Sequence, residues 1–406
     1  MYMSGEAESD AIARVIRSGK LIRSWGDSIS ETTSFEKEWA QKIGVPHALA
    51  VSTGTAALIC GLIAIGVEPG DEVIVPGYTF IATAMAPLNI GAVPVLAEVD
   101  AGLMLDPTDV ARKITPRTKA IIPVHMSGHV VNLEPILRLA REKGIKVLED
   151  CCQCDGGSYR GLRVGSHGDA GAFSFNFFKI LSCGEGGAVV TRELANYQRA
   201  RIYHDSGTGW RSDAKDLVVP LFAGVNYRMD EVRAAMMRVQ LGRLEGILSA
   251  LRSRCSRLRA LLVGNPGIDF APVHDESGDC GVSLFLRVES RADALRFMAA
   301  ARENKLPCSL PLDSAPHVFS NWTPLMQRRG AFHPTVDPLH ITEAGRAQRY
   351  APDMLPQTLA NLSRTISIGI NPLWTDMEVN LLAEKLLAAV NAGAALCAKA
   401  EMGNTV

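Results

Sequence analysis

The stretch FSFNFFKILSCGEGG, residues 173–187, places one lysine, Lys179, between a run of aromatic residues and a glycine-rich turn. Most lysines are solvated, so a surface lysine at the end of a buried strand is the simplest interpretation. The alternative is a lysine held in a pocket, where Phe175, Phe177 and Phe178 would desolvate its amine. Desolvation favours the neutral form of an amine, which is the nucleophile that a Schiff base requires. Residues elsewhere in the chain decide between the two interpretations.

Around this stretch the chain alternates short apolar segments with helical patterns. The apolar segments lack clear polar alternation and most are separated by helices, which is typical of a mostly parallel sheet covered on both faces. We predict strands at 47–52, 71–76, 92–99, 119–124, 145–150, 170–175 and 187–191, and helices at 55–66, 80–90, 107–113 and 132–143. The last three strands follow one another without full helices, so we expect the parallel order to break there. The sequence thus predicts an α/β fold with a mostly parallel seven-stranded sheet.

The second half of the chain has a different pattern of predicted helices and strands. Residues 230–262 have helical periodicity and are long enough to connect two domains. Strands at 281–288 and 365–370 and helices at 291–304 and 376–391 predict a smaller α+β domain. Residues 310–360, rich in Pro, His and Arg, are expected to be irregular and are a candidate substrate-facing loop. We predict a large domain at 1–245 and a small C-terminal domain at 246–406.

Composition excludes several functional classes. A net charge of −1 argues against a bulk electrostatic affinity for nucleic acid or an anionic membrane. The N-terminus has no signal pattern, and the longest apolar runs fall short of a membrane span. Nine scattered cysteines, an odd number, are expected of a reduced, cytoplasmic protein. The C-x-x-C within CCQC (151–154) lacks further metal ligands, so we expect no metal and interpret these cysteines as small apolar residues lining a tight site.

Small polar residues follow two of the predicted strands. In VSTGTAAL (51–58) a strand leads through a small-residue turn into a helix. The free backbone N–H groups of a helix N-terminus, with Gly54 allowing close approach and the Thr55 hydroxyl adding a donor, make an anion site. An N-cap without a ligand is equally consistent with this stretch alone. Ser174, on the strand before Lys179, would add another donor to a phosphate.

An acid ends another buried strand. Asp150 closes IKVLED, where a buried carboxylate costs several kcal/mol unless it meets a cation or a strong donor. A helix cap or a loop salt bridge is one interpretation, and a carboxylate paired with a protonated ring nitrogen is the other. Gln153 would lie nearby and could donate to a phenolic oxygen. Phe80 could stack on a flat cofactor, although an ordinary core aromatic is the simpler interpretation. A phosphate site, a carboxylate, a stacking ring and an amine together specify pyridoxal 5′-phosphate (PLP).

The motifs that carry these residues resemble the DegT/DnrJ/EryC1/StrS family, the PLP-dependent sugar aminotransferases of aspartate-aminotransferase fold type I. The matching segments are STGTAAL, GDEVIVPGYTFIATA, EDCCQCDGGSYRGLRVGSHGDAGAFSFNFFK, GEGGAVVT and GVNYRMDEVRAA. The resemblance is continuous from roughly residue 15 to 260 and weaker beyond.

The resemblance implies a role for each candidate residue. Lys179 would form the Schiff base with PLP, Asp150 would pair with the pyridine nitrogen and Gln153 would contact the oxygen side of the ring. Phe80 would stack on the ring, and the phosphate would be held by Gly54, Thr55 and Ser174. Asn226, whose simpler interpretation is a loop cap, would reach the phosphate of a partner subunit. The implied assembly is a homodimer with active sites at the subunit interface.

The resemblance also implies a ping-pong transamination. An amino acid, with glutamate expected, would convert PLP to pyridoxamine 5′-phosphate, which would then aminate a keto or aldehyde sugar. Lysine at 179, where dehydratases of the family carry histidine, favours transamination. Segments 93–136 and 203–207 resemble the subgroup acting on eight-carbon sugars, the 8-amino-octulosonate and lincosamide octose aminotransferases, which act in polysaccharide or antibiotic biosynthesis. His204 and His317 are candidate substrate contacts. The alternatives are a cyclitol aminotransferase, a PLP-dependent sugar dehydratase, or a cofactor-binding regulator on the same fold.

Overall fold

The large sheet has seven strands in the order β1-β9-β8-β5-β4-β2-β3. In chain order these are β1 His47–Val51, β2 Glu72–Pro76, β3 Val93–Ala97, β4 Thr118–Ile121, β5 Lys146–Asp150, β8 Ala170–Ser174 and β9 Gly187–Thr191. The pairs β3/β2, β2/β4, β4/β5 and β5/β8 are parallel, whereas β9 runs antiparallel to both β8 and β1. The predicted break in the parallel order is therefore confirmed at β9. The computed structural model describes residues 4–23, 30–212 and 214–403, with side chains up to residue 390.

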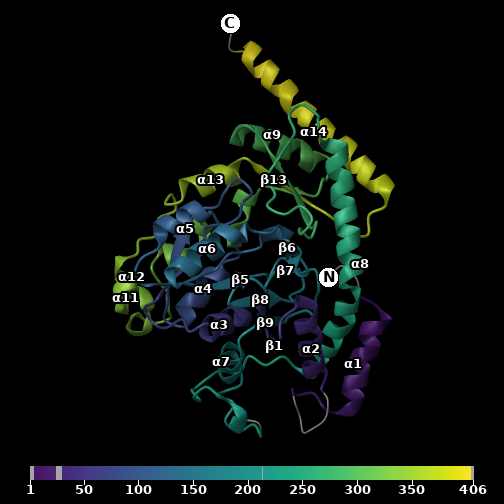
Figure 1. Cartoon of the computed structure of the whole chain (residues 1–406). Helices are drawn as coiled ribbons and strands as arrows, with labels where there is room; N and C mark the ends of the chain where they lie inside the picture. The colour runs from purple at the N-terminus through teal and green to yellow at the C-terminus, as the bar shows by residue number, and fades with distance from the viewer. Residues whose placement is uncertain (1–3, 24–29, 213, 404–406) are drawn as a thin grey trace.

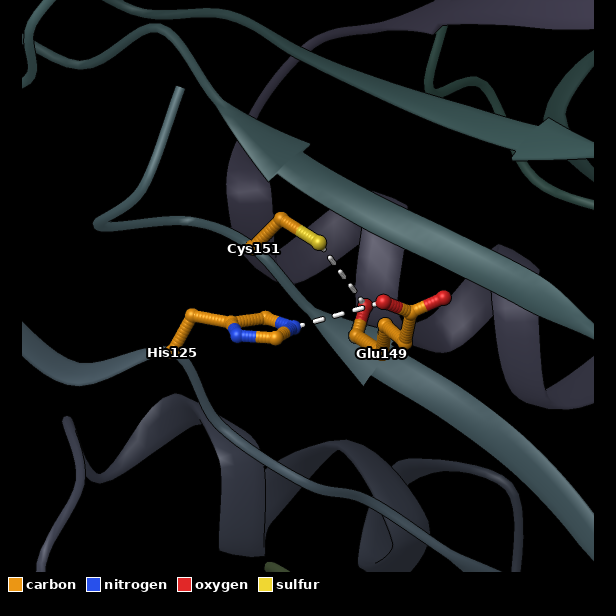
Figure 2. A group of neighbouring side chains, drawn as sticks. All are labelled: His125, Glu149 and Cys151. Atoms are coloured by element: carbon orange, nitrogen blue, oxygen red, sulfur yellow. Dashed lines mark hydrogen bonds and ion pairs between the residues drawn. The ribbon is translucent and has the colours of Figure 1, made fainter. Parts of the chain in front are cut away.

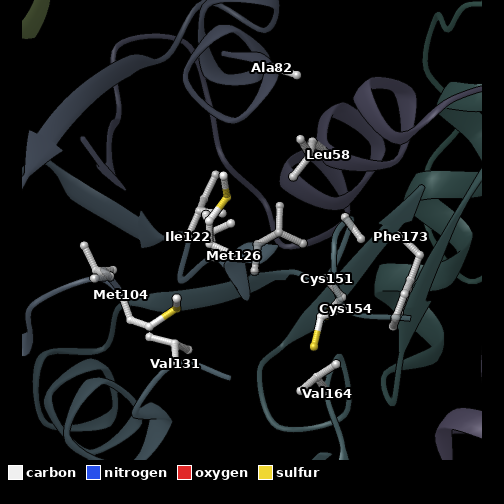
Figure 3. Packing of buried hydrophobic residues seen from close by; sticks show 14 of the residues in the cluster. Leu58, Ala82, Met104, Ile122, Met126, Val131, Cys151, Cys154, Val164 and Phe173 are labelled. Atoms are coloured by element: carbon white, nitrogen blue, oxygen red, sulfur yellow. The ribbon is translucent and has the colours of Figure 1, made fainter. Parts of the chain in front are cut away.

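Helices cover both faces of this sheet (Figure 1). They are α2 Glu31–Ile43, α3 Gly54–Ala64, α4 Ala82–Asn89, α5 Pro107–Lys113, α6 Leu133–Lys143 and α7 Leu194–His204. Every residue of β2, β3, β8 and β9 is buried, as the absence of polar alternation predicted. Figure 3 shows the core packing, with Cys151 and Cys154 among aliphatic and aromatic side chains. These two cysteines pack as small apolar residues.

The smaller sheet has the order β10-β11-β13-β12 and is antiparallel throughout. Its strands are β10 Asp269–Phe270, β11 Ser283–Arg287, β12 Cys308–Ser309 and β13 Thr365–Gly369, packed with α9 Arg291–Glu303 and α14 Asp376–Gly403. A long helix, α8 Glu231–Leu262, runs along one side of the molecule in Figure 1 and connects the two sheets. It packs against α1 Glu6–Ser18, α2 and α14. The predicted boundary at 245/246 falls inside this helix, and the division into two domains stays a prediction.

The segment predicted to be irregular returns to the large sheet. It contains the short helices η3 Pro311–Asp313, η4 Ala315–His317, η5 Phe319–Asn321, α10 Thr323–Met326, η6 Pro334–Val336, α11 Pro338–Ile341, α12 Glu343–Ala347 and the longer α13 Pro356–Ser363. The Tyr350 hydroxyl donates to the Pro94 carbonyl of β3 over 2.6 Å. Backbone N–H groups of Thr79 and Ile81 donate to the carbonyls of His317 and Pro316 over 3.0 and 2.9 Å. The two backbone contacts hold residues 316–317 beside the carboxyl end of β2, and the Tyr350 contact ties a later part of the segment to β3.

A short hairpin and two turns complete the fold: β6 Ser158–Tyr159 with β7 Leu162–Arg163, η1 Met126–Gly128 and η2 Ala214–Asp216. Among the residues that the structure describes, none of the helices has both the length and the hydropathy of a membrane span.

Candidate active site

A cavity of about 780 Å³ lies beyond the carboxyl ends of β2, β5 and β8. In open α/β sheets, ligands bind at this edge. Most of the predicted site residues line it: Gly54, Thr55, Phe80, Asp150, Gln153, Ser174, Lys179 and His317. Residues from the ends of β1, β2, β5 and β8 thus meet in one space, although they lie far apart in the sequence.

The anion site is formed where α3 approaches the end of β8. Thr53 caps the helix, its hydroxyl accepting the N–H of Ala56 over 3.0 Å. A Cβ added at Gly54 would lie 2.6 Å from the Ser174 Cβ and 2.9 Å from its Oγ, so only glycine permits this approach. The first-turn N–H groups have no partner inside the helix, and that turn has no acidic residue. The Ser174 hydroxyl beside these donors fits a phosphate group.

Asp150 lies at the end of β5 with only 3% of its surface exposed. Its Oδ2 accepts from the Thr83 hydroxyl over 2.8 Å, and its Oδ1 accepts from the backbone N–H of Cys152 over 3.0 Å. The Thr83 hydroxyl in turn lies 2.8 Å from that of Thr79. Because these donors are neutral and the carboxylate lines the cavity, it fits a protonated ring nitrogen of a ligand better than a loop salt bridge.

Gln153 is oriented by a residue that the sequence analysis missed. Its Oε1 accepts the backbone N–H of Ser127 over 3.1 Å, and both residues line the cavity. Ser127 has φ 54° and ψ 31°, a left-handed conformation that is uncommon for a serine. The chemical signal available in the sequence was slight, because MSGH (126–129) is a short polar turn like many others.

Lys179 is half-buried in the turn that follows β8, where its backbone N–H donates to the Asn176 carbonyl over 3.0 Å. The predicted desolvation by the three neighbouring phenylalanines is wrong in this chain. Phe175 packs in the core, 5.2 Å from the Trp39 ring, while Phe177 and Phe178 are 55% and 81% exposed. The chain leaves the sheet after Ser174, so strand alternation no longer directs these side chains inward. Phe178 lines the cavity but is 81% exposed, so it leaves the Lys179 amine open to solvent on that side.

His317 faces Phe80 across the cavity, with the ring centroids 5.6 Å apart and tilted by 56°. Its Nδ1 lies 2.6 Å from the Ser314 hydroxyl, so Nε2 is the ring nitrogen available to a ligand. Burial and the nearby charge of Lys179 lower the pKa of His317 to about 4. The imidazole is therefore neutral at neutral pH. Of the predicted substrate-facing segment 310–360, only Pro316 and His317 line the cavity.

Two predicted site residues lie elsewhere. His204 is fully buried at the end of α7, and its Nδ1 lies 2.7 Å from the Arg201 carbonyl. Burial and the charge of Arg23 lower the pKa of His204 to about 3. This placement corrects the expectation that His204 contacts substrate. His204 does not line the cavity, and its side chain has no exposed surface through which it could reach a ligand. Asn226 is exposed, and its Oδ1 accepts the backbone N–H of Arg228 over 3.2 Å.

The buried side chains of His125, Glu149 and Cys151 form a group of potential metal ligands (Figure 2). Glu149 accepts three backbone N–H groups from residues 165–168 over 2.7–2.8 Å, and His125 Nε2 lies 3.3 Å from it. Burial alone would raise the pKa of Glu149, but these partners, His125 first, hold it below its usual value. His125 Nδ1 accepts the Val131 N–H over 3.3 Å. Because these ligand atoms are already engaged, the cluster holds β5 in place rather than binding a metal.

The model of the DegT/DnrJ/EryC1/StrS aminotransferase family matches residues 3–316. This match extends beyond residue 260, where the motifs predicted that the resemblance weakens. It ends one residue before His317.

Curated relatives cover most of the chain. It is 38% identical over 266 residues to 3-amino-5-hydroxybenzoate synthase of Amycolatopsis mediterranei, spanning 65% of this chain and 67% of the relative. It is 36% identical over 304 residues to dTDP-3-amino-3,4,6-trideoxy-alpha-D-glucose transaminase of Streptomyces venezuelae, spanning 74% and 77%. A protein of Streptoalloteichus tenebrarius named as an L-glutamine:3-amino-2,3-dideoxy-scyllo-inosose aminotransferase is 34% identical over 309 residues, spanning 75% and 72%.

Solved structures match over nearly the whole length. 3-Amino-5-hydroxybenzoic acid synthase has a TM-score of 0.79 at 30% identity, covering 96% of this chain and 97% of that one. DesV of S. venezuelae, solved with a ketimine intermediate, has a TM-score of 0.77 at 29% identity, covering 94% of each chain. The family match, these relatives and the shared fold together show that the chain belongs to the DegT/DnrJ/EryC1/StrS aminotransferase family and is an enzyme, an aminotransferase.

Proposed function

We propose that this aminotransferase uses PLP to move an amino group from an amino acid, L-glutamate, to the carbonyl of a keto or aldehyde sugar. The observation that carries the proposal is the meeting of Lys179, Asp150 and the Gly54–Ser174 anion site in one cavity. An amine, a buried carboxylate and phosphate donors are the set of groups that PLP requires of a protein.

Each residue of the cavity has a place in this proposal. Gly54, Thr55 and Ser174 would hold the phosphate, Asp150 the ring nitrogen, Gln153 the ring oxygen and Phe80 the face of the ring. When bound, PLP supplies an electron sink that stabilises negative charge on the carbon bearing the amine. Asp150, fixed by Thr83 and the Cys152 N–H, holds a proton on the ring nitrogen. The Lys179 amine is placed to move a proton at the reacting carbon, as a general base and then a general acid.

The sugar acceptor is supported by relatives rather than by the cavity alone. One relative is named as a transaminase of a dTDP-sugar, and the names given above do not include an eight-carbon sugar. The eight-carbon acceptor rests on segments 93–136 and 203–207 and is the finer proposal. His317, just beyond the family match, would contact the acceptor through Nε2. We expect His317→Ala to raise the KM for the sugar while leaving the reaction with glutamate less affected.

A cyclitol acceptor is the second candidate. The relative named for an amino-dideoxy-scyllo-inosose favours it, because that protein matches 75% of this chain. Incubating the enzyme with glutamate and either a keto-sugar or a keto-cyclitol, followed by mass analysis of the product, separates the two. Loss of oxygen without amination would instead identify a dehydratase.

We also propose a homodimer with active sites at the subunit interface. Phe178, which lines the cavity and is 81% exposed, fits a surface that a second subunit covers. Asn226 would reach the partner's phosphate site. The eight cysteines whose side chains the structure describes are unpaired, which supports a cytoplasmic location.

The experiment that tests the proposal follows PLP and glutamate with the purified protein. We expect an absorption band in the near-visible region when PLP binds, bleaching of that band by L-glutamate, and formation of 2-oxoglutarate. Lys179→Ala should abolish both the band and turnover. Lys143→Ala, which removes an exposed lysine from the end of α6, is the matched control and should change neither. Retention of the band and of turnover in Lys179→Ala would refute the assignment.

A further inference from the structure

A chain of hydrogen bonds reaches the cavity from outside it. His129 follows η1, and its Nδ1 lies 2.6 Å from Oδ2 of Asp279, while its Nε2 lies 3.1 Å from the hydroxyl of Ser283, the first residue of β11. The Ser283 hydroxyl donates to the Ser127 carbonyl over 3.0 Å. The Ser127 N–H donates to Gln153 Oε1 over 3.1 Å. We call these five residues the His129 chain. The catalytic assignment above does not use its first three members.

Counting hydrogens along the His129 chain shows which ring nitrogen donates to Ser283. The Ser283 hydroxyl has a single hydrogen, and the Ser127 carbonyl can only accept, so that hydrogen lies between these two residues. His129 Nε2 must then be the donor to Ser283. The carboxyl group of Asp279 faces the other ring nitrogen, Nδ1, and its Oδ1 accepts the Val130 N–H over 2.8 Å. His129 is therefore held between Asp279 and Ser283, with a hydrogen on Nε2.

The surroundings of the ring are consistent with this hydrogen-bond pattern. The Phe285 ring lies 4.4 Å from the imidazole, centroid to centroid, and offers no acceptor that competes with Asp279. Arg252 of α8 points at the backbone instead, donating to the Asp279 carbonyl over 2.7 Å. The Cys255 thiol lies 3.8 Å from the Ser283 carbonyl. Among the described residues, Asp279 is thus the carboxylate that faces the ring, and Arg252 is a cation that contacts the backbone of the same residue.

The His129 chain ends at the side-chain amide of Gln153 and fixes its orientation. Ser127 holds an uncommon left-handed conformation, and both its carbonyl and its N–H have partners in the chain. Because a backbone N–H can only donate, Gln153 must turn its carbonyl oxygen to Ser127 and its NH₂ group away from it. A flipped amide would bring its hydrogens against the Ser127 N–H and leave both groups unsatisfied.

We propose that His129, held by Asp279, is a positioning residue that fixes the amide orientation of Gln153 through Ser283 and Ser127. The amide then presents an N–H donor, rather than a carbonyl, to an anionic oxygen on the ligand's ring. Residues beyond α8 thereby control a contact in the cavity of the large sheet. The inference rests on the proposed function, because the contact of Gln153 with the cofactor is part of that function.

A double-mutant cycle on cofactor affinity tests the coupling. The probe is pyridoxamine 5′-phosphate, which binds without a covalent bond to Lys179, added to the full chain freed of cofactor and followed by fluorescence. We expect Ser283→Ala to weaken binding about three- to tenfold, the size of one lost hydrogen bond, and by less than about twofold in a Gln153→Ala background. Ser367→Ala, the same deletion on the neighbouring strand β13, is the matched control and should change neither value. Equal weakening by Ser283→Ala in both backgrounds, or none in either, would overturn the proposal.

A second measurement does not depend on the cofactor. In protein labelled with ¹⁵N-histidine, the imidazole signals that disappear in His129→Gln should show a hydrogen on Nε2. A His129 ring without a hydrogen on Nε2 would overturn the proposed His129 chain even if PLP binds. If neither the wild type nor any variant binds pyridoxamine 5′-phosphate, the proposed function itself fails. Thermal unfolding of each variant shows whether it is folded, and Ser283→Cys, which keeps the size and weakens the donor, replaces Ser283→Ala if the alanine variant does not fold.

Discussion

At the scale of single residues, the support of Asp150 by Thr83 is the contact that most directly affects the chemistry. The Thr83 hydroxyl donates to the carboxylate over 2.8 Å inside a buried site. Thr83→Val keeps the shape and removes this donor. A hydrogen bond to a charged group contributes about 1.5–3 kcal/mol, so we expect the rate of the glutamate reaction to fall about ten- to a hundredfold. Single-turnover absorbance measurements give this rate.

The control for this prediction is the neighbouring hydroxyl. Thr79→Val removes a partner of Thr83 that does not itself contact Asp150, so its effect should be smaller. Equal losses in both variants would show that the pair acts through packing and not through the carboxylate.

His317 makes the stability of the folded protein depend on pH. Its pKa is lowered to about 4, while an unfolded histidine titrates near 6.5. Between these values the unfolded state binds more protons than the folded state, so stability falls as the pH drops through this window and is unaffected above it. Between about pH 7.5 and about pH 5, we expect the free energy of unfolding of His317→Gln to fall by about 1 kcal/mol less than that of the wild type. This value is reduced to allow for the partial exposure of the ring.

Urea unfolding at the two pH values measures this difference. His333→Gln, at an exposed histidine in the same half of the chain, is the control and should behave as the wild type does. A wild-type slope in His317→Gln would mean that another group carries the acid sensitivity.

At the scale of elements, the approach of α3 to β8 decides whether a phosphate is held. A Cβ at residue 54 would meet the Ser174 side chain at 2.6 Å, a contact too close to keep. Gly54→Ala should push the two elements apart and weaken PLP binding more than tenfold, while overpacking costs about 1–3 kcal/mol of stability. Binding of pyridoxal, which lacks the phosphate, should change much less. Comparing the two affinities in one variant isolates the phosphate contact.

Two further variants make this prediction specific. Ser174→Gly in the Gly54→Ala background should return part of the stability, because it removes the atoms that the new methyl group meets. Gly242→Ala, in α8 with nothing within 4 Å of the added Cβ, should stabilise the helix without changing PLP binding. If pyridoxal and PLP lose affinity equally in Gly54→Ala, the site is not a phosphate site.

The strands of the large sheet could be predicted because burial on both faces leaves a plain signal. Each predicted segment contains an observed strand whose ends lie within three residues of the predicted ends, except that β4 begins at Thr118, one residue before its segment. The helices α1, α2 and α7 were not predicted. For α1 the reason is that it buries only Glu8, Ala11 and Val15 and its pattern is mainly polar. The pairing of residues 316–317 with 79–81 could not be predicted, since a contact of so few residues across the chain has no periodicity.

The same reasoning explains which site residues were found. Gly54, Asp150, Ser174 and Lys179 follow strands that the sequence shows, and parallel strands bring their carboxyl ends to one edge. Ser127 and Thr83 act through hydrogen bonds to other side chains and lie in short turns or inside a helix. His204 and His317 looked alike in the sequence, and only packing places one in the core and the other in the cavity.

At the scale of the whole molecule, the cavity depends on a segment of the second half of the chain, residues 310–360, which packs against the large sheet. Glu98, buried after β3, accepts from both the N–H and the hydroxyl of Thr358 over 2.6 Å. Tyr350 and His317 join the same sheet from this segment. A domain boundary at residue 245 would place Thr358, Tyr350 and His317 in the small domain, although all three contact the large-sheet part of the chain. The site is therefore a product of both halves of the chain.

The proposed homodimer makes the site depend on a second chain as well, and mixing two inactive variants tests this. If Asn226 serves the partner's site, a mixed dimer of Lys179→Ala and Asn226→Ala subunits has one site with both defects and one site with neither. Random assortment makes about half of the dimers mixed, each with one working site of two, so activity should return to about a quarter of the wild type. If Asn226 serves its own chain instead, every site carries one defect and mixing restores nothing. Assays at limiting PLP, before and after unfolding and refolding the two variants together, separate the outcomes, and sedimentation shows whether the particles are dimers.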